Sequence, residues 1–198
     1  MNEITSKENL LVHKIIEFYN ISINLNIYLN IVLQKNEISL RLLDWFVTNY
    51  SKKNNICYSL NNEYYYPFKS YKSHLKAYSK KYCDPFCRRE RVILDYSNNN
   101  IRLLLQESAQ ECNNKNQIIT TLAQLNFFKF AISHGIIEYV KNNLTLIEND
   151  MNTTLKEREF EKKFVNISSV SNIKRKELSK SGNKSVNITV VNAIIKFI

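Results

Sequence analysis

The chain has 198 residues and carries 28 lysine and arginine residues against 18 aspartate and glutamate residues, which gives a formal net charge of +10. A chain of this length suits one domain with an ordinary hydrophobic core, so it needs neither disulfides nor a structural metal. Its two glycines, Gly135 and Gly182, lie far apart. They cannot build a glycine-rich phosphate loop or a G-x-S-x-G turn, which excludes most large classes of nucleotide-using enzyme.

The first 50 residues contain three predicted helices. Thr5 and Glu8 have the spacing of a capping box, and apolar residues follow at helical intervals, which predicts a helix over residues 6–20. Residues 21–33 fit two periods, because their isoleucines and leucines alternate with mostly polar residues as in a strand and also repeat every fourth residue. The length of this run favours a helix. Residues 37–50 have an amphipathic pattern that predicts a third helix.

The middle of the chain contains the predicted strands. Residues 56–66, which hold two adjacent asparagines, indicate a small hairpin or a loop. Residues 92–96 and 101–105 are apolar runs on either side of three asparagines. Asparagine tolerates the left-handed backbone of tight turns, so the second pattern predicts a hairpin.

Helices are predicted again after residue 120. Thr121 and Gln124 form another capping box, and the helix that follows ends at Gly135. A short helix is expected over residues 136–141, and a last helix over residues 158–164.

These elements predict an α+β protein, a helix-dominated single domain with a small antiparallel sheet or hairpin. We expect residues 1–165 to form one globular domain. Residues 166–198 are expected to be a basic linker or tail, because residues 173–184 are rich in lysine and residues 186–198 are apolar and strand-like.

Positive charge is concentrated in two segments. Residues 69–91 carry eight basic and two acidic side chains, and residues 162–184 carry seven basic and one acidic. Segregated charge produces a local positive field that attracts polyanions such as nucleic acid. The alternative is that these lysines form a solvated surface with no partner.

The sharpest charge pattern lies in residues 68–82. At about 100° per residue, a helix here gathers lysines in one narrow sector and turns tyrosines to the opposite side. The lysines are Lys69, Lys72, Lys76 and Lys80, and the inner residues are Tyr71, Leu75, Tyr78 and Tyr82. Arg88, Arg89 and Arg91 follow directly, after the corner at Asp84 and Pro85.

A surface shared by this lysine ridge and the three arginines would suit a phosphate backbone. Lysine acts as a point charge, and arginine binds phosphate oxygens in a fork. The pattern contains no signal for base readout, so we expect binding that depends on salt and little on base sequence.

Two further patterns allow a functional and a structural interpretation. Phe127, Phe128 and Phe130 could stack on bases, but phenylalanines at this spacing more often pack a core, and we expect core. The same expectation applies to Trp45 and Phe46.

The cysteines raise a second question, since Cys83 and Cys87, with His74 upstream and Cys112 downstream, could ligate zinc. The spacing is loose and no second pair of ligands completes the motif. We expect buried, reduced thiols at these three cysteines and a reduced thiol at Cys57, and we expect no bound metal, no cofactor and no catalytic residue.

The start of the chain is acidic and its apolar stretch is interrupted by asparagine, which argues against a signal peptide. No run approaches the roughly 18 apolar residues that a membrane span requires. We therefore expect an intracellular protein that does not contact membranes.

Several stretches of the chain can be compared with known families. They are residues 43–53 (LDWFVTNYSKK), 75–81, 84–89, 120–128 (TTLAQLNFF) and the basic residues 175–179. These stretches resemble a family of small, uncharacterised proteins encoded by mimivirus-like and other large nucleocytoplasmic DNA viruses. The resemblance spans most of the chain between Leu40 and Lys184. It implies a viral protein that acts in the host cytoplasm, at the virus factory, or is packaged in the virion. It implies no catalytic or ligand-binding residue.

The leading hypothesis is a viral accessory protein that is not an enzyme and that contacts the backbone of DNA or RNA through a basic helix. The alternative is a structural or interaction protein of the virion or virus factory that makes no contact with nucleic acid. Such a protein would use an apolar surface, on residues 21–33 or 186–198, for self-association or for binding other viral proteins.

Overall fold

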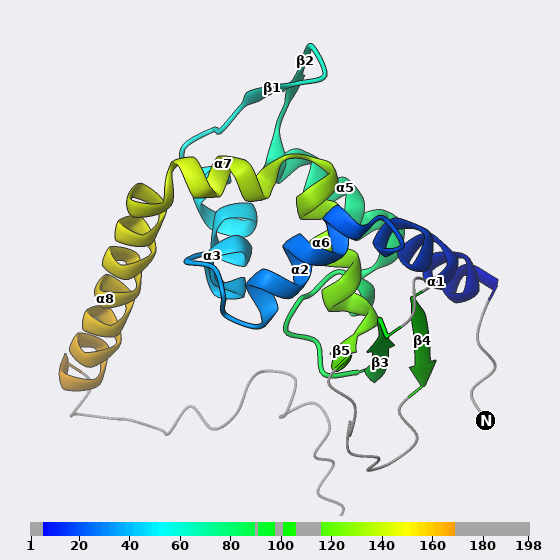
Figure 1. Cartoon of the computed structure of the whole chain (residues 1–198). Helices are drawn as coiled ribbons and strands as arrows, with labels where there is room; N and C mark the ends of the chain where they lie inside the picture. The colour runs from blue at the N-terminus through cyan, green and yellow to red at the C-terminus, as the bar shows by residue number, and fades with distance from the viewer. Residues whose placement is uncertain (1–5, 90, 98–100, 106–115, 169–198) are drawn as a thin grey trace, which may run out of the picture. The chain divides into compact units, whose positions relative to one another are not determined.

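The computed structural model describes residues 6–89, 91–97, 101–105 and 116–168. It divides into two compact units, residues 1–153 and 154–198, and the elements below belong to the first unit except where stated. The first unit combines many helices with two small antiparallel sheets, so the predicted helix-dominated α+β class is confirmed (Figure 1). The basic segment at residues 173–184 and the apolar residues 186–198 lie outside the described part of the chain.

The chain begins with α1 (Ser6–Tyr19) and α2 (Ser22–Val32), as predicted. The ambiguous run at residues 21–33 is helical, and Tyr28 and Ile31 are buried one turn apart on its inner side. The hydroxyl of Tyr19 donates to the carbonyl of Leu125 at 2.8 Å. The hydroxyl of Tyr28 donates to Thr120 Oγ1, also at 2.8 Å. These two buried hydrogen bonds fix both helices to the centre of the unit, because a buried hydroxyl is costly without a partner.

The predicted helix at residues 37–50 is the helical run α3 (Leu40–Trp45), η1 (Phe46–Tyr50) and α4 (Ser51–Lys53). It starts later than predicted because Ser39 is the N-cap, and its hydroxyl accepts from the backbone N–H of Leu42 at 3.1 Å. The middle section is a π-helix, and the backbone stays helical across both junctions. Trp45 and Phe46 are buried, so the core interpretation of both is confirmed.

Residues 56–66 form a hairpin rather than a loop, with β1 (Tyr58–Leu60) paired to β2 (Glu63–Tyr65). Asn61 and Asn62 supply the two-residue turn, with φ of 52° and 65°. Both values lie in the left-handed region that asparagine tolerates, and they suit the primed turns of hairpins.

The helix predicted over residues 68–82 is confirmed up to Tyr78 and is wrong in its last four residues. α5 covers Pro67–Tyr78 and stops at Ser79, whose φ is 63°, and a separate 3₁₀ turn, η2, covers Lys80–Tyr82. A serine in the left-handed region gives no signal in the sequence, whereas glycine or proline would have marked the break.

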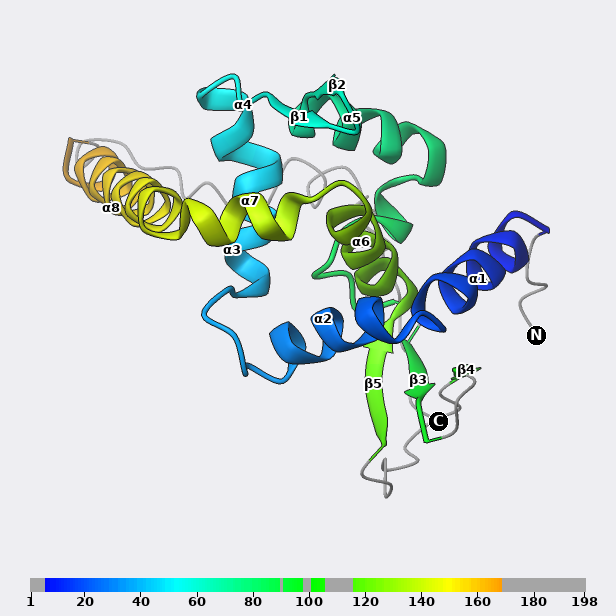
Figure 2. The same ribbon diagram turned by 45° about the horizontal axis from the view of Figure 1, so that its top comes forward.

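A three-stranded sheet lies at the other end of the first unit from the β1–β2 hairpin (Figures 1 and 2). Its order is β4-β3-β5, all antiparallel, with β3 (Arg91–Asp95), β4 (Arg102–Leu105) and β5 (Gln117–Thr121). The predicted hairpin is therefore confirmed as the β3–β4 pair. β5 was not predicted, and it makes β3 the central strand.

The core forms around α6 (Leu122–Ser133), which contacts α1, α2, α7, η2 and β5. Phe127, Phe128 and Phe130 are all buried, which confirms the core interpretation. The hydroxyl of Thr121 accepts from the backbone N–H of Gln124 at 3.1 Å, so the predicted N-cap is confirmed. Gly135, with φ of 66°, separates α6 from α7 (Ile136–Asn142).

The last helix, α8 (Leu144–Ser168), is much longer than the predicted residues 158–164 and runs from the first unit into the second. Its start was missed because residues 144–153 are polar at most positions. The helical spacing of Leu144, Ile147 and Met151, which pack against the core, is the signal. No helix in the described ranges is long and apolar enough to cross a membrane.

Candidate nucleic-acid interface

The lysine-bearing helix α5 is amphipathic, as predicted for its first part. Pro67 occupies the first turn, where its missing N–H costs no helical hydrogen bond. Tyr71 is buried, and Leu75 and Tyr78 are half-buried against the core. Lys69, Lys72 and Lys76 are all exposed, so packing sorts the aromatic residues inward and leaves the three lysines in solvent.

The charge on this outer face is unopposed. The sequence of α5 contains no aspartate or glutamate. Within the described residues, no carboxylate lies in ion-pair distance of Lys69, Lys72 or Lys76. The ammonium of Lys69 lies 4.5 Å from the centre of the Tyr66 ring. A cation held over a ring keeps its full charge, which leaves it available to a phosphate.

The turn α4 adds a lysine that sequence reasoning did not assign to this surface. Lys52 is exposed, and its ammonium lies 5.5 Å from the centre of the Phe68 ring in α5. Its neighbour Lys53 instead pairs with Asp150. We call Lys52, Lys69, Lys72 and Lys76 the α4–α5 lysine cluster. Its fourth member comes from a contact between elements, which helical periodicity alone cannot reveal.

Lys80 does not continue the ridge, which corrects the prediction of four aligned lysines. It follows the break at Ser79, and its ammonium lies 3.8 Å from a carboxylate oxygen of Asp84. Both residues line a hollow of about 430 Å³ together with Asp44. Burial and the nearby charge of Asp84 raise the pKa of Asp44 to about 6, while Lys80 acts in the opposite direction. The carboxylate of Asp84 thus offsets the charge of Lys80 in part.

The three arginines are not joined to the lysine cluster by any contact in the described residues. Arg88 and Arg89 are exposed in the connection between η2 and β3, and Arg91 is the exposed first residue of β3. Figures 1 and 2 place β3 and the β1–β2 hairpin at opposite ends of the unit. The three arginines therefore lie apart from the α4–α5 lysine cluster, and the role predicted for them remains a prediction.

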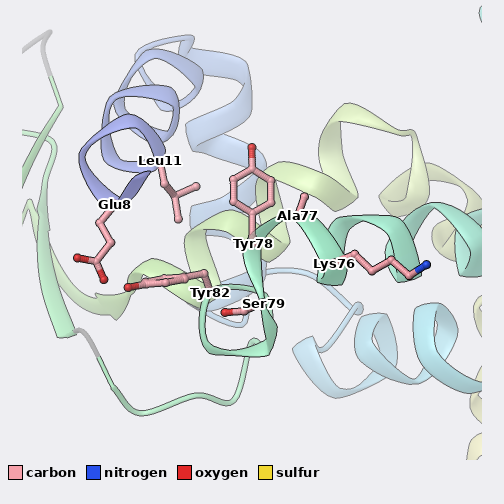
Figure 3. Close-up of a pocket in the computed structure, with 7 residues that line it drawn as sticks. All are labelled: Glu8, Leu11, Lys76, Ala77, Tyr78, Ser79 and Tyr82. Carbon is pink, nitrogen blue, oxygen red and sulfur yellow. The ribbon is translucent and has the colours of Figure 1, made fainter. Parts of the chain in front are cut away.

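A smaller hollow of about 270 Å³ lies between α1 and the junction of α5 with η2 (Figure 3). Glu8 from α1 points into it, and Tyr78 and Tyr82 line it. Glu8 also pairs with Lys81 at 3.5 Å. In Figure 3 the side chain of Lys76 extends away from Glu8, so this carboxylate offsets the charge of Lys81 and leaves that of Lys76 unopposed.

The thiols differ from one another in environment. Cys83 is buried, as expected, and burial raises the pKa of its thiol to about 12, which keeps it protonated. Cys87 is only half-buried, so the expectation of a buried thiol is met in part there, and Cys57 is exposed. Cys83 Sγ lies 3.7 Å from the backbone carbonyl of His74. Cys112 lies outside the described residues, and within them no group of three or more metal-binding side chains occurs.

The β1–β2 hairpin is fixed beside α5 by contacts that the sequence did not suggest. The hydroxyl of Tyr58 donates to the carbonyl of His134 at 2.8 Å. The ring of Tyr65 stacks on the His134 imidazole with ring centres 4.9 Å apart. The ring of Tyr58 stacks on that of Tyr139 with ring centres 5.0 Å apart. His134 is thus part of the aromatic anchor that holds the hairpin against α6 and α7.

The site and fold define a helix-dominated α+β protein with an exposed lysine cluster. The profile of a protein family described as a family of unknown function (DUF7197) matches residues 1–197, and the chain belongs to that family. It is also 35% identical over 182 residues to an uncharacterized protein of Acanthamoeba polyphaga mimivirus, an alignment that covers 89% of this chain and 66% of that relative. The predicted resemblance to an uncharacterised family of mimivirus-like viruses is therefore confirmed. No solved structure matches the chain.

Proposed function

We propose that this viral protein is a non-enzymatic accessory protein that binds the backbone of nucleic acid through the α4–α5 lysine cluster. The observation that carries the proposal is the set of exposed lysines on one face, for which the described residues offer no carboxylate partner. The fold does not require this face to be purely basic, because an exposed helical surface tolerates acidic and basic residues alike. We place this activity at the virus factory in the host cytoplasm or in the virion.

The chemistry of the cluster determines the kind of binding expected. Each lysine that neutralises a phosphate releases a counterion, so affinity falls with salt. Four such contacts on duplex DNA correspond to a slope of about −3 to −4 in log K against log salt concentration. The cluster contains ammonium groups and no bidentate side chain that could read a base pair. Binding should therefore tolerate any base sequence.

Fluorescence anisotropy with labelled oligonucleotides across a salt series tests the proposal. The test variant replaces three lysines of α5 by glutamine, and a control variant removes equal charge from exposed lysines elsewhere in the first unit. The test set is Lys69, Lys72 and Lys76, and the control set is Lys14, Lys35 and Lys141. The test variant should reduce the salt slope by about 3, whereas the control should leave it nearly unchanged. Equal losses in the two variants, or no binding by the native chain at low salt, would refute the proposal.

A second candidate, a structural or interaction protein, is favoured by one observation on α2. Ile21 at its N-cap is 54% exposed and Ile23 is 67% exposed, although both are large apolar residues. Under this candidate function the chain self-associates or binds another viral protein through this end of α2. Size-exclusion chromatography should then show a larger species that Ile23→Asp converts to monomer. A monomeric native chain that crosslinks to no partner would argue against it.

A further inference from the structure

The β1–β2 hairpin has aromatic residues on both of its faces, and only one face is needed for packing. Side chains alternate along a strand, so Tyr58 and Tyr65 share the inner face that contacts His134 and Tyr139. Tyr64 and Tyr66 point the opposite way. Tyr64 is 83% exposed and Tyr66 is 43% exposed. Burial of apolar area therefore does not account for Tyr64 and accounts only in part for Tyr66.

The outer face of the hairpin is adjacent to the lysine cluster. Lys69 lies over the Tyr66 ring at 4.5 Å, and Tyr66 immediately precedes α5. Lys52 on α4 reaches Phe68 in the first turn of α5. Figure 2 shows α4, the hairpin and the beginning of α5 along one side of the unit. The ring of Tyr66 is thus bordered by an ammonium group, and Tyr64 lies two residues before it on the same side of the hairpin. The helices α4 and α5, which carry the lysines, contact one another.

The hairpin holds these rings in a defined place. Its two-residue turn at Asn61 and Asn62 is the tight type that matches the twist of paired strands. Its inner face is fixed by the Tyr58 hydrogen bond to the carbonyl of His134. A ring presented from an anchored hairpin loses little conformational freedom when it binds, which favours affinity.

We infer that the outer face of the β1–β2 hairpin and the α4–α5 lysine cluster together bind single-stranded nucleic acid in preference to duplex. This inference rests on the function proposed above and specifies its ligand. Bases of a single strand are unpaired and can stack on Tyr64 and Tyr66, while Lys52, Lys69 and Lys72 neutralise the phosphates. In a duplex the base faces are occupied by neighbouring pairs, so the rings contribute nothing. Stacking accepts every base, in agreement with the absence of a base-reading group.

The inference is tested by anisotropy titrations with four ligands of equal length at one salt concentration. The ligands are oligothymidylate, oligouridylate, a mixed-sequence DNA duplex and a duplex RNA. The single strands should bind more tightly than either duplex. The two single strands separate DNA from RNA as the natural ligand, because the 2′-hydroxyl is their main difference at the backbone.

Variants at Tyr64 distinguish stacking from charge. Tyr64→Leu removes the ring but keeps an apolar side chain, and it should weaken single-strand binding at least about fivefold while leaving duplex binding unchanged. Tyr64→Phe keeps the ring and should bind as the native chain does. Glu63→Gln removes the acid beside the ring and should strengthen binding to every ligand. Circular dichroism of each variant verifies that these exposed substitutions leave the fold intact.

The outcomes separate the two proposals. Equal affinity for single strands and duplexes, or an unchanged single-strand affinity in Tyr64→Leu, would overturn the single-strand preference and leave a general polyanion surface. Tyrosine would then stand at these positions for its strand propensity alone. Absence of binding to all four ligands would overturn the proposed function itself.

Discussion

The helices α5 and α6 each have twelve residues and three phenylalanine or tyrosine side chains, yet they are placed in opposite surroundings. In α6 most residues are buried, including all three phenylalanines. In α5 only Pro67 and Tyr71 are buried, and its lysines lie in solvent. Aromatic content alone therefore says little about function, because the packing around a helix decides whether its rings form core or surface.

The two helices also differ in how strongly packing constrains their residue types. Packing on several sides constrains nearly every residue of α6. Among the described residues no element covers the lysine-bearing face of α5, so the choice of lysine without any acid there is not dictated by the described packing. Substitutions in the two helices should accordingly separate stability from binding, and the following predictions test that separation.

The largest effect is expected from Phe128→Ala in α6. Phe128 is fully buried and packs edge-on against Tyr28, with ring centres 5.0 Å apart. Removal of such a ring leaves a cavity and should lower the free energy of unfolding by about 3–5 kcal/mol. Urea denaturation measures this loss. The folded fraction should still bind oligonucleotides, and Lys72→Ala in α5 should change stability by at most about 0.5 kcal/mol. Similar losses in the two variants would contradict the comparison.

A smaller loss is expected at Asn126, which connects the two regions. This buried amide donates from Nδ2 to the carbonyl of Tyr82 at 2.7 Å, so α6 holds the turn that follows α5. Asn126→Leu leaves that carbonyl without its partner and should cost about 1–3 kcal/mol in the free energy of unfolding. Asn142→Leu, at an exposed position, is the control. A neutral result at Asn126 would mean that the turn is held by its other contacts.

Much of this arrangement could be predicted from local sequence. The Thr121–Gln124 capping box, the turn-forming asparagines and the spacing of Tyr71 and Leu75 are local signals, and each element that depends on them is present. Residues 117–121, which form β5, pair with β3, which lies more than twenty residues away in sequence. Strand pairing across that distance cannot be inferred from spacing.

The candidate site was predictable in part, for the same reason. The three lysines of α5 follow from helical periodicity, whereas Lys52 joins them only through a contact between α4 and α5. Lys80 was misplaced because the helix ends at Ser79, whose positive φ is not signalled by its residue type. The anchored hairpin depends on His134, some seventy residues from Tyr65. Local patterns therefore identified the charge, and tertiary contacts decided how it is grouped.

A third effect concerns the free energy of unfolding on acidification. His74 and Asp44 should each change it by about 1–2 kcal/mol, in opposite directions. Burial, His134 and Lys129 lower the pKa of His74 to about 4, against an unfolded value near 6.5. The unfolded state then binds more protons between these values, so His74 destabilises the fold as pH falls from 6.5 to 4. The pKa of Asp44 is raised to about 6, so Asp44 stabilises the fold as pH falls from 6 towards 4. The magnitude allows for solvent screening at both half-buried groups.

Single substitutions separate these two contributions. Relative to the native chain, Asp44→Asn should lose stability more steeply between pH 6.5 and 4. His74→Gln should lose it less steeply over the same interval. Urea denaturation at several pH values measures both slopes. The rings that contact the His74 imidazole belong to Tyr78 and Phe130, and neither ionises in this interval. Equal slopes in the two variants would show that neither group controls acid stability.

The smallest predicted effect concerns binding rather than stability. It compares two lysines within the basic segment at residues 69–91. Lys72 and Lys80 are both exposed lysines, but Lys80 has Asp84 at 3.8 Å and Lys72 has no carboxylate at that range among the described residues. Lys72→Gln should reduce the slope of log K against log salt by about 1, because one phosphate contact is lost. Lys80→Gln should reduce the slope by less, because the carboxylate of Asp84 already acts in part as the counterion of Lys80. The two variants have the same net charge. A difference between them in an anisotropy salt series would therefore assign binding to unopposed charge, whereas identical slopes would show that the chain responds only to its total charge.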